Sequence, residues 1–158
     1  MLNNAYNEGV TRTSDPQFHY LEMDAENALL DGQVQGLVIT FHVNERPLHG
    51  LAGILDWRFQ GAISRCLQAG AITGAAGECV YLPIARHGET YHLILAGAGQ
   101  SPSPGVRESV PPETVKAIQK NLGSLRLQKV AVSRKDFGNA SDEFFTRHLK
   151  GVPLWIVS

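Results

Sequence analysis

Two apolar runs constrain the fold of this chain more than any other feature. They are VQGLVITFHV (34–43) and YHLILAGAG (91–99), in which aliphatic and aromatic residues follow one another almost without alternation. A strand with one face in water alternates apolar and polar residues, whereas a continuous apolar run is typical of a strand covered on both faces. Both runs are far shorter than the roughly 20 residues needed to cross a bilayer. We therefore expect two central strands of a sheet that is covered on both sides.

Four further segments have the pattern of strands. They are FHYLEM (18–23), which alternates and could be an edge strand, CVYLPIA (79–85), LQKVAVS (127–133) and VPLWIVS (152–158). The link at 86–90 has the length of a hairpin connection, so the two strands that it joins should pair antiparallel.

Helical spacing occurs in three segments between these strands. Over 48–70, Leu51, Ile54 and Leu55 should share a buried face, and Gly61 predicts a kink or two short helices. A second helix should begin near Pro111-Pro112 and end at Gly123, and a third should span 141–150.

This alternation of strands and helices predicts an α/β fold. We expect a three-layer α/β/α arrangement with a mixed, mostly parallel central sheet. The chain has 158 residues, of which 43% are hydrophobic, enough for one core and too few for two well-packed domains. We predict a flexible N-terminal arm over 1–16 and a single α/β domain over 17–158.

The charge balance excludes some classes of partner. The chain carries 15 acidic and 14 basic residues, a net charge of −1, so no cationic field would attract nucleic acid or an anionic membrane. The polar N-terminus lacks the apolar segment of a secretory signal, which favours a cytoplasmic protein. Cys66 and Cys79 are then expected to be reduced thiols.

The loop after 91–99 offers the most suggestive candidate for ligand binding. Gly97 and Gly99 would let backbone N–H groups approach a ligand, and ligands of open α/β sheets bind beyond the carboxyl ends of strands. Gln100 and Ser101 add polar side chains, and Arg107 could pair with a phosphate. The alternative is that this segment is only a tight exit from a central strand.

Two other features leave structural and functional alternatives open. The glycines at 70, 74 and 77 could form an anion-binding nest or a flexible surface loop. Asp56, beside Trp57 in a helical segment, could cap a helix, join a buried network or contact a ligand.

Motifs of catalysis and metal binding are absent from the sequence. No HExxH, CxxC or P-loop pattern occurs, and Ser64 lacks the glycine pattern of a nucleophile elbow. Cys66 is spaced to face the apolar side of its helix. We therefore predict no catalytic residue, no metal site and no cofactor.

One long segment resembles a known family. Residues 46–100, with RPLHGLAGILDW near their start and YHLILAGAGQ at their end, resemble the N-terminal domain of the leucyl (cytosol) aminopeptidases. The matching residues are Pro47, Leu48, Gly50, Asp56, Gly61, Gly74, Gly77, Glu78, Gly97 and Gly99. The resemblance implies a macro-domain-like fold. It implies no peptidase activity, because the family's zinc site and its N-T-D-A-E-G-R signature lie in a separate C-terminal domain.

The resemblance leads to three hypotheses about function. The first is a stand-alone, non-catalytic homologue of that domain, acting through an unknown protein partner or self-association, since the family's domain contributes to a hexamer. The second is a small-ligand module that binds a nucleotide or an ADP-ribose-like anion at 97–105. The third is an enzyme that hydrolyses such a ligand, for which the sequence shows no acid–base pair.

Overall fold

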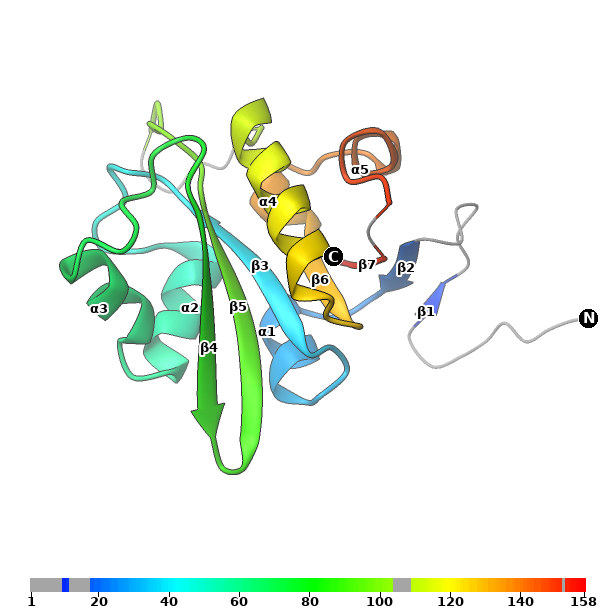
Figure 1. Ribbon diagram of the computed structural model, residues 1–158, viewed down its shortest axis with the longest axis horizontal. Helices are drawn as coiled ribbons and strands as arrows, with labels where there is room; N and C mark the ends of the chain where they lie inside the picture. Colours follow the sequence, from blue (N-terminus) through cyan, green and yellow to red (C-terminus); the bar gives the residue numbers. More distant parts are fainter. Residues whose placement is uncertain (1–9, 12–17, 104–108, 152) are drawn as a thin grey trace, which may run out of the picture.

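The strands form one mixed sheet. The computed structural model describes residues 10–11, 18–103, 109–151 and 153–158, and among them the sheet order is β1-β2-β7-β6-β3-β5-β4 (Figure 1). Strands β2, β7, β6, β3 and β5 run parallel, and β1 and β4 are antiparallel at the two edges. The strands are β1 (Val10–Thr11), β2 (Phe18–Leu21), β3 (Gly36–Phe41), β4 (Cys79–Arg86), β5 (Glu89–Gly97), β6 (Val130–Ser133) and β7 (Leu154–Val157).

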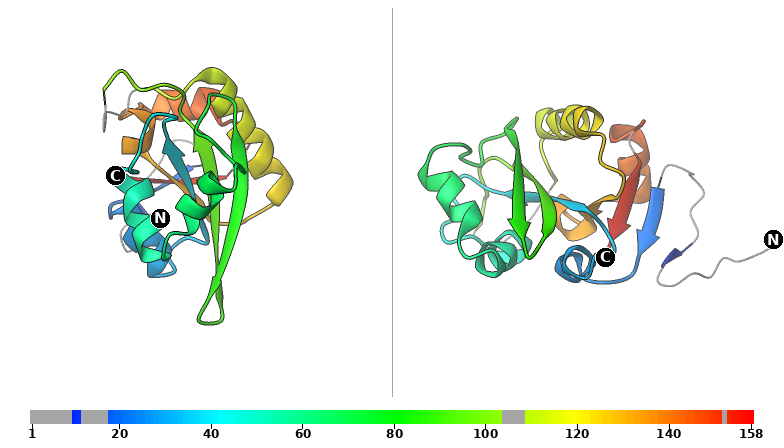
Figure 2. Two further views of the ribbon diagram at one scale, coloured as in Figure 1. Left: turned by 90° about the vertical axis from the view of Figure 1, so that its left-hand side faces the viewer. Right: turned by 60° about the horizontal axis from the view of Figure 1, so that its bottom comes forward.

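Helices cover both faces of this sheet. One face packs against α1 (Ala25–Leu30), α2 (Gly50–Arg58) and α3 (Ala62–Gln68), and the other against α4 (Pro112–Leu125) and α5 (Asp142–His148) (Figure 2). A short 3-10 helix, η1 (Arg134–Phe137), follows β6. The predicted three-layer α/β/α class with a mixed, mostly parallel sheet is therefore confirmed. No helix among the described residues has the length and apolarity needed to cross a membrane.

The two apolar runs form β3 and β5, which are neighbouring interior strands of the sheet, although β5 lies next to the edge strand β4 and not at the centre. All six residues of β3 are buried. Leu37 and Leu95 belong to the core cluster beneath α1, α2 and α3, whereas Val38 and Ile94 belong to the cluster beneath α4 and α5. The alternating side chains of one strand thus enter two separate cores, which is why both runs are apolar almost throughout.

Three details differ from the sequence prediction. Helix α1 was not predicted, because its six residues are too few to show a helical period. Strand β2 is not an edge strand, because Val10–Thr11 pairs with it. Ile54, predicted to be buried, is 43% exposed, since Leu51, Ala52 and Leu55 form the buried face of α2.

The predicted break near Gly61 separates α2 from α3. Gln60 and Gly61 have φ angles of 56° and 81°, a left-handed backbone that ends one helix before the next begins. Asp56 then bridges the break. Its carboxylate accepts hydrogen bonds from Ser64 N (2.9 Å) and Ser64 Oγ (2.5 Å), near the start of α3. Asp56 therefore stabilises the first turn of α3 in the manner of a helix cap.

The hairpin of β4 and β5 confirms the predicted antiparallel pair. Its two-residue turn, His87-Gly88, has positive φ at both positions, as a type I′ turn requires. Pro83 lies opposite His92, whose N–H donates to Gln35 O on the far side of β5. The pair is thus not hydrogen-bonded, and the donor that Pro83 lacks would have faced the open edge of β4. A proline there weakens edge-to-edge pairing with another sheet.

Candidate functional site

The sheet has a topological switch point between β3 and β6. These neighbouring parallel strands lead to opposite faces: β3 continues to α2, and β6 continues through η1 to α5. Connections that part in this way leave a crevice at the carboxyl ends of the strands, and ligands of open α/β sheets bind in such crevices.

The two strands separate at this point because a side chain takes the place of the next backbone hydrogen bond between them. Their pairing ends at Val38 and Val132. Beyond it, the buried carboxylate of Asp136 in η1 accepts a hydrogen bond from Thr40 N at 2.9 Å, and Thr40 Oγ1 donates to Asp136 O at 3.0 Å. Asp136 therefore provides the hydrogen-bond acceptor for the N–H of Thr40 in β3, while η1 turns away from that strand.

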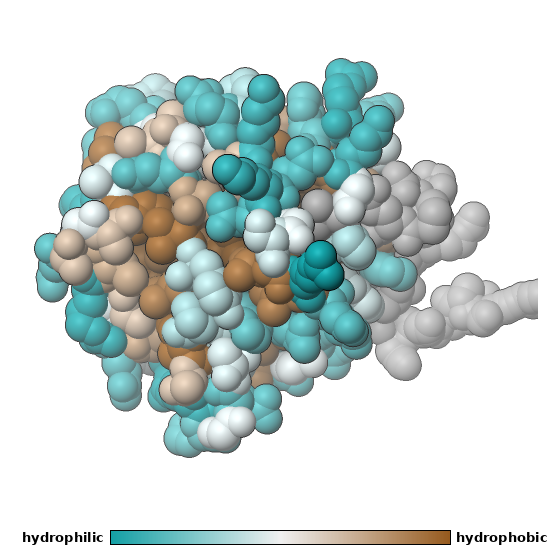
Figure 3. Space-filling model, in the orientation of Figure 1, coloured by the Kyte–Doolittle hydropathy of each residue, from teal (hydrophilic) through white to brown (hydrophobic). Residues whose placement is uncertain are grey.

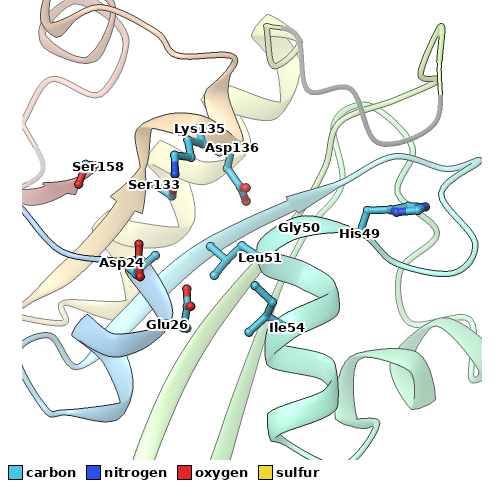
Figure 4. Close-up of a pocket in the computed structure, with 11 residues that line it drawn as sticks. Asp24, Glu26, His49, Gly50, Leu51, Ile54, Ser133, Lys135, Asp136 and Ser158 are labelled. Carbon is cyan, nitrogen blue, oxygen red and sulfur yellow. The ribbon is translucent and has the colours of Figure 1, made fainter.

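A cleft of about 310 Å³ opens at this switch point (Figure 4). Its volume lies at the lower end of the range of about 300–1,000 Å³ that is typical of small-molecule sites. Four segments far apart in the sequence line it: the start of α1, the start of α2, the end of β6 with η1, and the residue after β7. The lining residues are Asp24, Ala25, Glu26, His49, Gly50, Leu51, Ile54, Ser133, Lys135, Asp136 and Ser158.

The cleft combines charged and apolar side chains. In Figure 4, Asp24 and Glu26 lie opposite Leu51 and Ile54, and Lys135 lies on the η1 side. Asp24 is exposed and is the N-cap of α1, yet its side chain makes no capping hydrogen bond. Its carboxylate can therefore accept hydrogen bonds from a ligand without loss of a helix cap.

The start of α2 lies at the cleft, since Gly50 and Leu51 are among the lining residues. The first N–H groups of a helix have no intrahelical acceptor and carry partial positive charge, so they favour an anion. Gly50 has a φ angle of 59°, and a Cβ there would meet nothing within 4 Å. Glycine thus provides a left-handed backbone and leaves open space at the first residue of α2. In Figure 4 the imidazole of His49 points away from the other labelled side chains.

A buried carboxylate positions the segment that leads into α2. Glu45 is 2% exposed, and its two oxygens accept hydrogen bonds from His42 N (3.0 Å) and His49 N (2.7 Å). Asn44 and Ser101 exchange two hydrogen bonds, 3.0 and 2.9 Å long, which tie this segment to the loop after β5. The segment that leads into α2 is therefore fixed at Asn44 and at His49.

The candidates from the sequence lie on the β5 side of β3. Gly97 is the last residue of β5, Gly99 and Ser101 make backbone contacts with the 42–44 segment, and Gln100 is exposed. None of these four lines the cleft at the switch point. Arg107 lies outside the described residues. A ligand role for this loop stays a prediction.

The cleft residues escaped the sequence analysis. The rule that ligands bind beyond strand ends was applied to β5 and not to β6 or β2. Asp24 follows the segment 18–23 directly, and Lys135 and Asp136 follow Ser133 at the end of β6. The same rule, applied to each predicted strand, would have found all three.

The loop over 70–78 forms a nest around the chain's own carboxylate. The backbone N–H groups of Thr73, Gly74 and Ala75 all donate to Glu78 Oε1, at 2.8, 2.8 and 3.0 Å. Thr73 Oγ1 also contacts both carboxylate oxygens at 3.0 Å. Burial by itself raises the pKa of Glu78, but these hydrogen bonds favour the charged form and lower the pKa below its usual value.

We expect Glu78 to make stability depend on pH in the acid range. A depressed folded-state pKa contributes stability that is present above the unfolded pKa and is lost as pH falls through the folded value. Glu78→Gln should lower the free energy of unfolding by about 1 kcal/mol at pH 7. It should also flatten the fall in stability below about pH 4.3, the ordinary pKa of glutamate. Urea titrations between pH 3 and 7 measure both effects; identical pH profiles would contradict the nest.

Both cysteines are free, and burial reduces their acidity. Desolvation raises the pKa of the Cys66 thiol and raises that of Cys79 to about 11. Both are therefore protonated at neutral pH and are poor nucleophiles. No group of three or more metal-binding side chains occurs in the part of the chain that the structure describes.

Comparison with solved structures identifies the fold. The macrodomain of DarG from Thermus aquaticus aligns with 89% of this chain and 97% of its own, at a TM-score of 0.63 and 15% identity. The DarG macrodomain of Mycobacterium tuberculosis aligns with 89% of this chain and 96% of its own, at a TM-score of 0.62 and 17% identity. Thermosipho africanus DarTG, solved in complex with ADP-ribose, aligns with 90% of this chain and 42% of its own, at a TM-score of 0.65 and 12% identity. The chain therefore has a macrodomain-like fold.

The aminopeptidase resemblance holds only at the level of fold. A tomato leucine aminopeptidase mutant aligns with 89% of this chain and 32% of its own, at a TM-score of 0.56 and 15% identity. No family model and no curated protein matches the sequence. The leading hypothesis, a non-catalytic aminopeptidase-type domain acting through protein contacts or self-association, is contradicted by these macrodomain neighbours, which favour the ligand-binding alternative.

Proposed function

We propose that this chain is a binding module for ADP-ribose or a closely related nucleoside diphosphate. The observation that carries the proposal is the cleft at the β3–β6 switch point, where the start of α2 faces a space lined by both charged and apolar side chains. A nucleoside diphosphate combines an anionic centre with flat and hydroxylated groups at its ends, and the cleft offers a partner for each.

The parts of the cleft suit different parts of such a ligand. Backbone N–H groups at the start of α2 and the ammonium of Lys135 would bind the diphosphate. Leu51 and Ile54 would contact the base or the face of a ribose. The carboxylates of Asp24 and Glu26 can accept hydrogen bonds from an exocyclic amino group or from ribose hydroxyls.

The comparisons support the same class of ligand by analogy. DarTG of Thermosipho africanus was solved in complex with ADP-ribose, and this chain shares the fold of 42% of the DarTG chain. A shared fold does not by itself carry a function, so the proposal rests on the cleft.

Titration calorimetry with ADP-ribose tests this proposal. Lys135→Ala removes one exposed charge from the cleft and should weaken binding about fivefold, the equivalent of about 1 kcal/mol. Asp24→Ala should weaken it by a similar factor, without lost stability from a broken cap bond. Lys116→Ala, a change of the same charge on α4 away from the cleft, should leave the affinity unchanged.

A thermal-shift measurement gives an independent readout. Ligand at 100 times its Kd should stabilise the folded chain by about 2.7 kcal/mol, and Lys135→Ala should reduce that shift at equal ligand concentration. Absence of binding to the wild-type chain, or equal affinities of Lys135→Ala and the wild type, would refute the proposed site.

A further inference from the structure

A groove continues from the cleft along the outer side of α1 and α2. It has a volume of about 720 Å³ and shares four lining residues with the cleft. Beyond these it extends past Asn27 and Gly53 to Trp57 and Arg58. The shared residues are Glu26, His49, Gly50 and Ile54. The cleft and the groove therefore adjoin each other at the start of α2.

Trp57 is the most unusual residue of the groove. It is 76% exposed, and with Ile54 it is one of two large apolar side chains exposed among the described residues. The two are three residues apart on α2 and therefore lie on the same side of the helix. Trp57 also lines a neighbouring hollow beside Pro47 and Gly61, so its ring can be approached from more than one direction.

Positive charge accompanies this exposed ring. Arg58 lines the groove, and Arg46 lines the neighbouring hollow that also contains Trp57. The guanidinium of Arg46 donates to Glu45 O (2.8 Å) and Thr73 O (3.1 Å), both uncharged carbonyl groups. The neighbouring acid, Asp56, receives two hydrogen bonds from Ser64. A flat ring that carries phosphate groups suits an exposed indole with arginines lining the adjoining hollows.

We propose that this groove is a second subsite, in which Trp57 stacks on a planar heterocycle belonging to the same ligand. The inference rests on the proposed function, because it takes the nucleotide in the cleft as the anchor. The ligand class is a dinucleotide: two bases joined through ribose and phosphate groups. Gly50 and Trp57 are seven residues apart on α2, about 10 Å of helix rise. The link between the bases must span that distance.

A series of ligands with links of different length tests the inference. ADP-ribose has one base, whereas diadenosine diphosphate, triphosphate and tetraphosphate carry a second base on progressively longer links. Stacking of a base on an aromatic side chain contributes on the order of 1–3 kcal/mol, so the dinucleotide with the best-matched link should bind about tenfold more tightly than ADP-ribose.

Variants of Trp57 separate stacking from other contacts. Trp57→Ala should abolish the tenfold gain and leave the affinity for ADP-ribose unchanged, because Trp57 does not line the cleft. Trp57→Phe, which keeps an aromatic ring, should retain most of the gain. In a Trp155→Phe background, where Trp57 is the remaining tryptophan, the matched dinucleotide should quench the fluorescence and ADP-ribose should not.

The outcomes distinguish this inference from the proposed function. If ADP-ribose binds but no dinucleotide binds more tightly, or if the gain survives in Trp57→Ala, the second subsite is refuted and the cleft stands. If neither kind of ligand binds, both proposals fail. Binding of a dinucleotide alone, lost in Trp57→Ala, would support the stacking subsite and refute the assignment of ADP-ribose.

Discussion

Gly97→Val should lower the free energy of unfolding by about 3 kcal/mol or more, at the upper end of overpacking effects. A Cβ on Gly97 would lie 1.9 Å from Ala75 O and 2.7 Å from Gly74 C. These are backbone atoms, so no side-chain rotation can relieve the clash. Gly97 N also donates to Glu78 O at 2.9 Å, which holds the end of β5 against the 74–78 segment. The substitution must therefore separate the two segments.

Chemical denaturation measures this loss, and Gly123→Ala provides a matched control. Gly123 lies within α4, and a Cβ there would meet nothing within 4 Å. Alanine should stabilise that helix by up to about 1 kcal/mol, because glycine is a poor helix former. Equal denaturation midpoints for Gly97→Val and the wild type would contradict the close packing of β5 against the loop. Because Gly97→Val is expected to destabilise the fold, it is unsuited as a probe of ligand binding.

Leu95→Ala should destabilise the fold by about 2–5 kcal/mol, the usual cost of a large-to-small change in a core. Leu95 is 0% exposed and lies in β5 between Ile39 of β3 and Val80 of β4. Its side chain enters the core beneath α1, α2 and α3. Removal of three carbon atoms there leaves a cavity that the two neighbouring strands cannot close without disturbing the ladder.

Ile54→Ala is the matched control for the loss of stability expected in Leu95→Ala. It also removes aliphatic carbon, but from a side chain that is 43% exposed, so the loss should be under about 1 kcal/mol. Urea titrations of both variants measure the difference. Similar losses for the two would contradict either the complete burial of Leu95 in β5 or the exposure of Ile54 on α2.

The sheet was predictable because its signal is local and strong. Buried parallel strands must be apolar on both faces, and the short runs that contain Val38, Ile39 and Ile94 show this without any knowledge of the rest of the chain. The antiparallel hairpin and the break at Gly61 were predictable for a related reason: short connections and glycine leave few conformations open. Helix α1 gave no such signal, because only three of its residues are buried, Ala25, Ala28 and Leu29, and the helix is too short to show a long amphipathic face.

The cleft could not be predicted as a whole because no segment contains it. Asp24, Gly50 and Lys135 come from three connections that meet only when β2, β3 and β6 take their places in the sheet. Strand order is a long-range property that pairing energies decide, and periodicity does not show it. Gly97 and Gly99 were predicted as possible ligand contacts. At Gly97 the structure gives another physical reason for glycine, the close approach of the 74–75 backbone.

A crystal structure of the chain grown with a saturating concentration of ADP-ribose tests the proposed site most directly. We predict density for the diphosphate at the start of α2, near Gly50 and Lys135, with the rest of the ligand in the cleft between α1 and η1. Density on the 97–103 loop with an empty cleft, or no bound ligand at a concentration that saturates binding in solution, would contradict the assignment of this cleft as the nucleotide site.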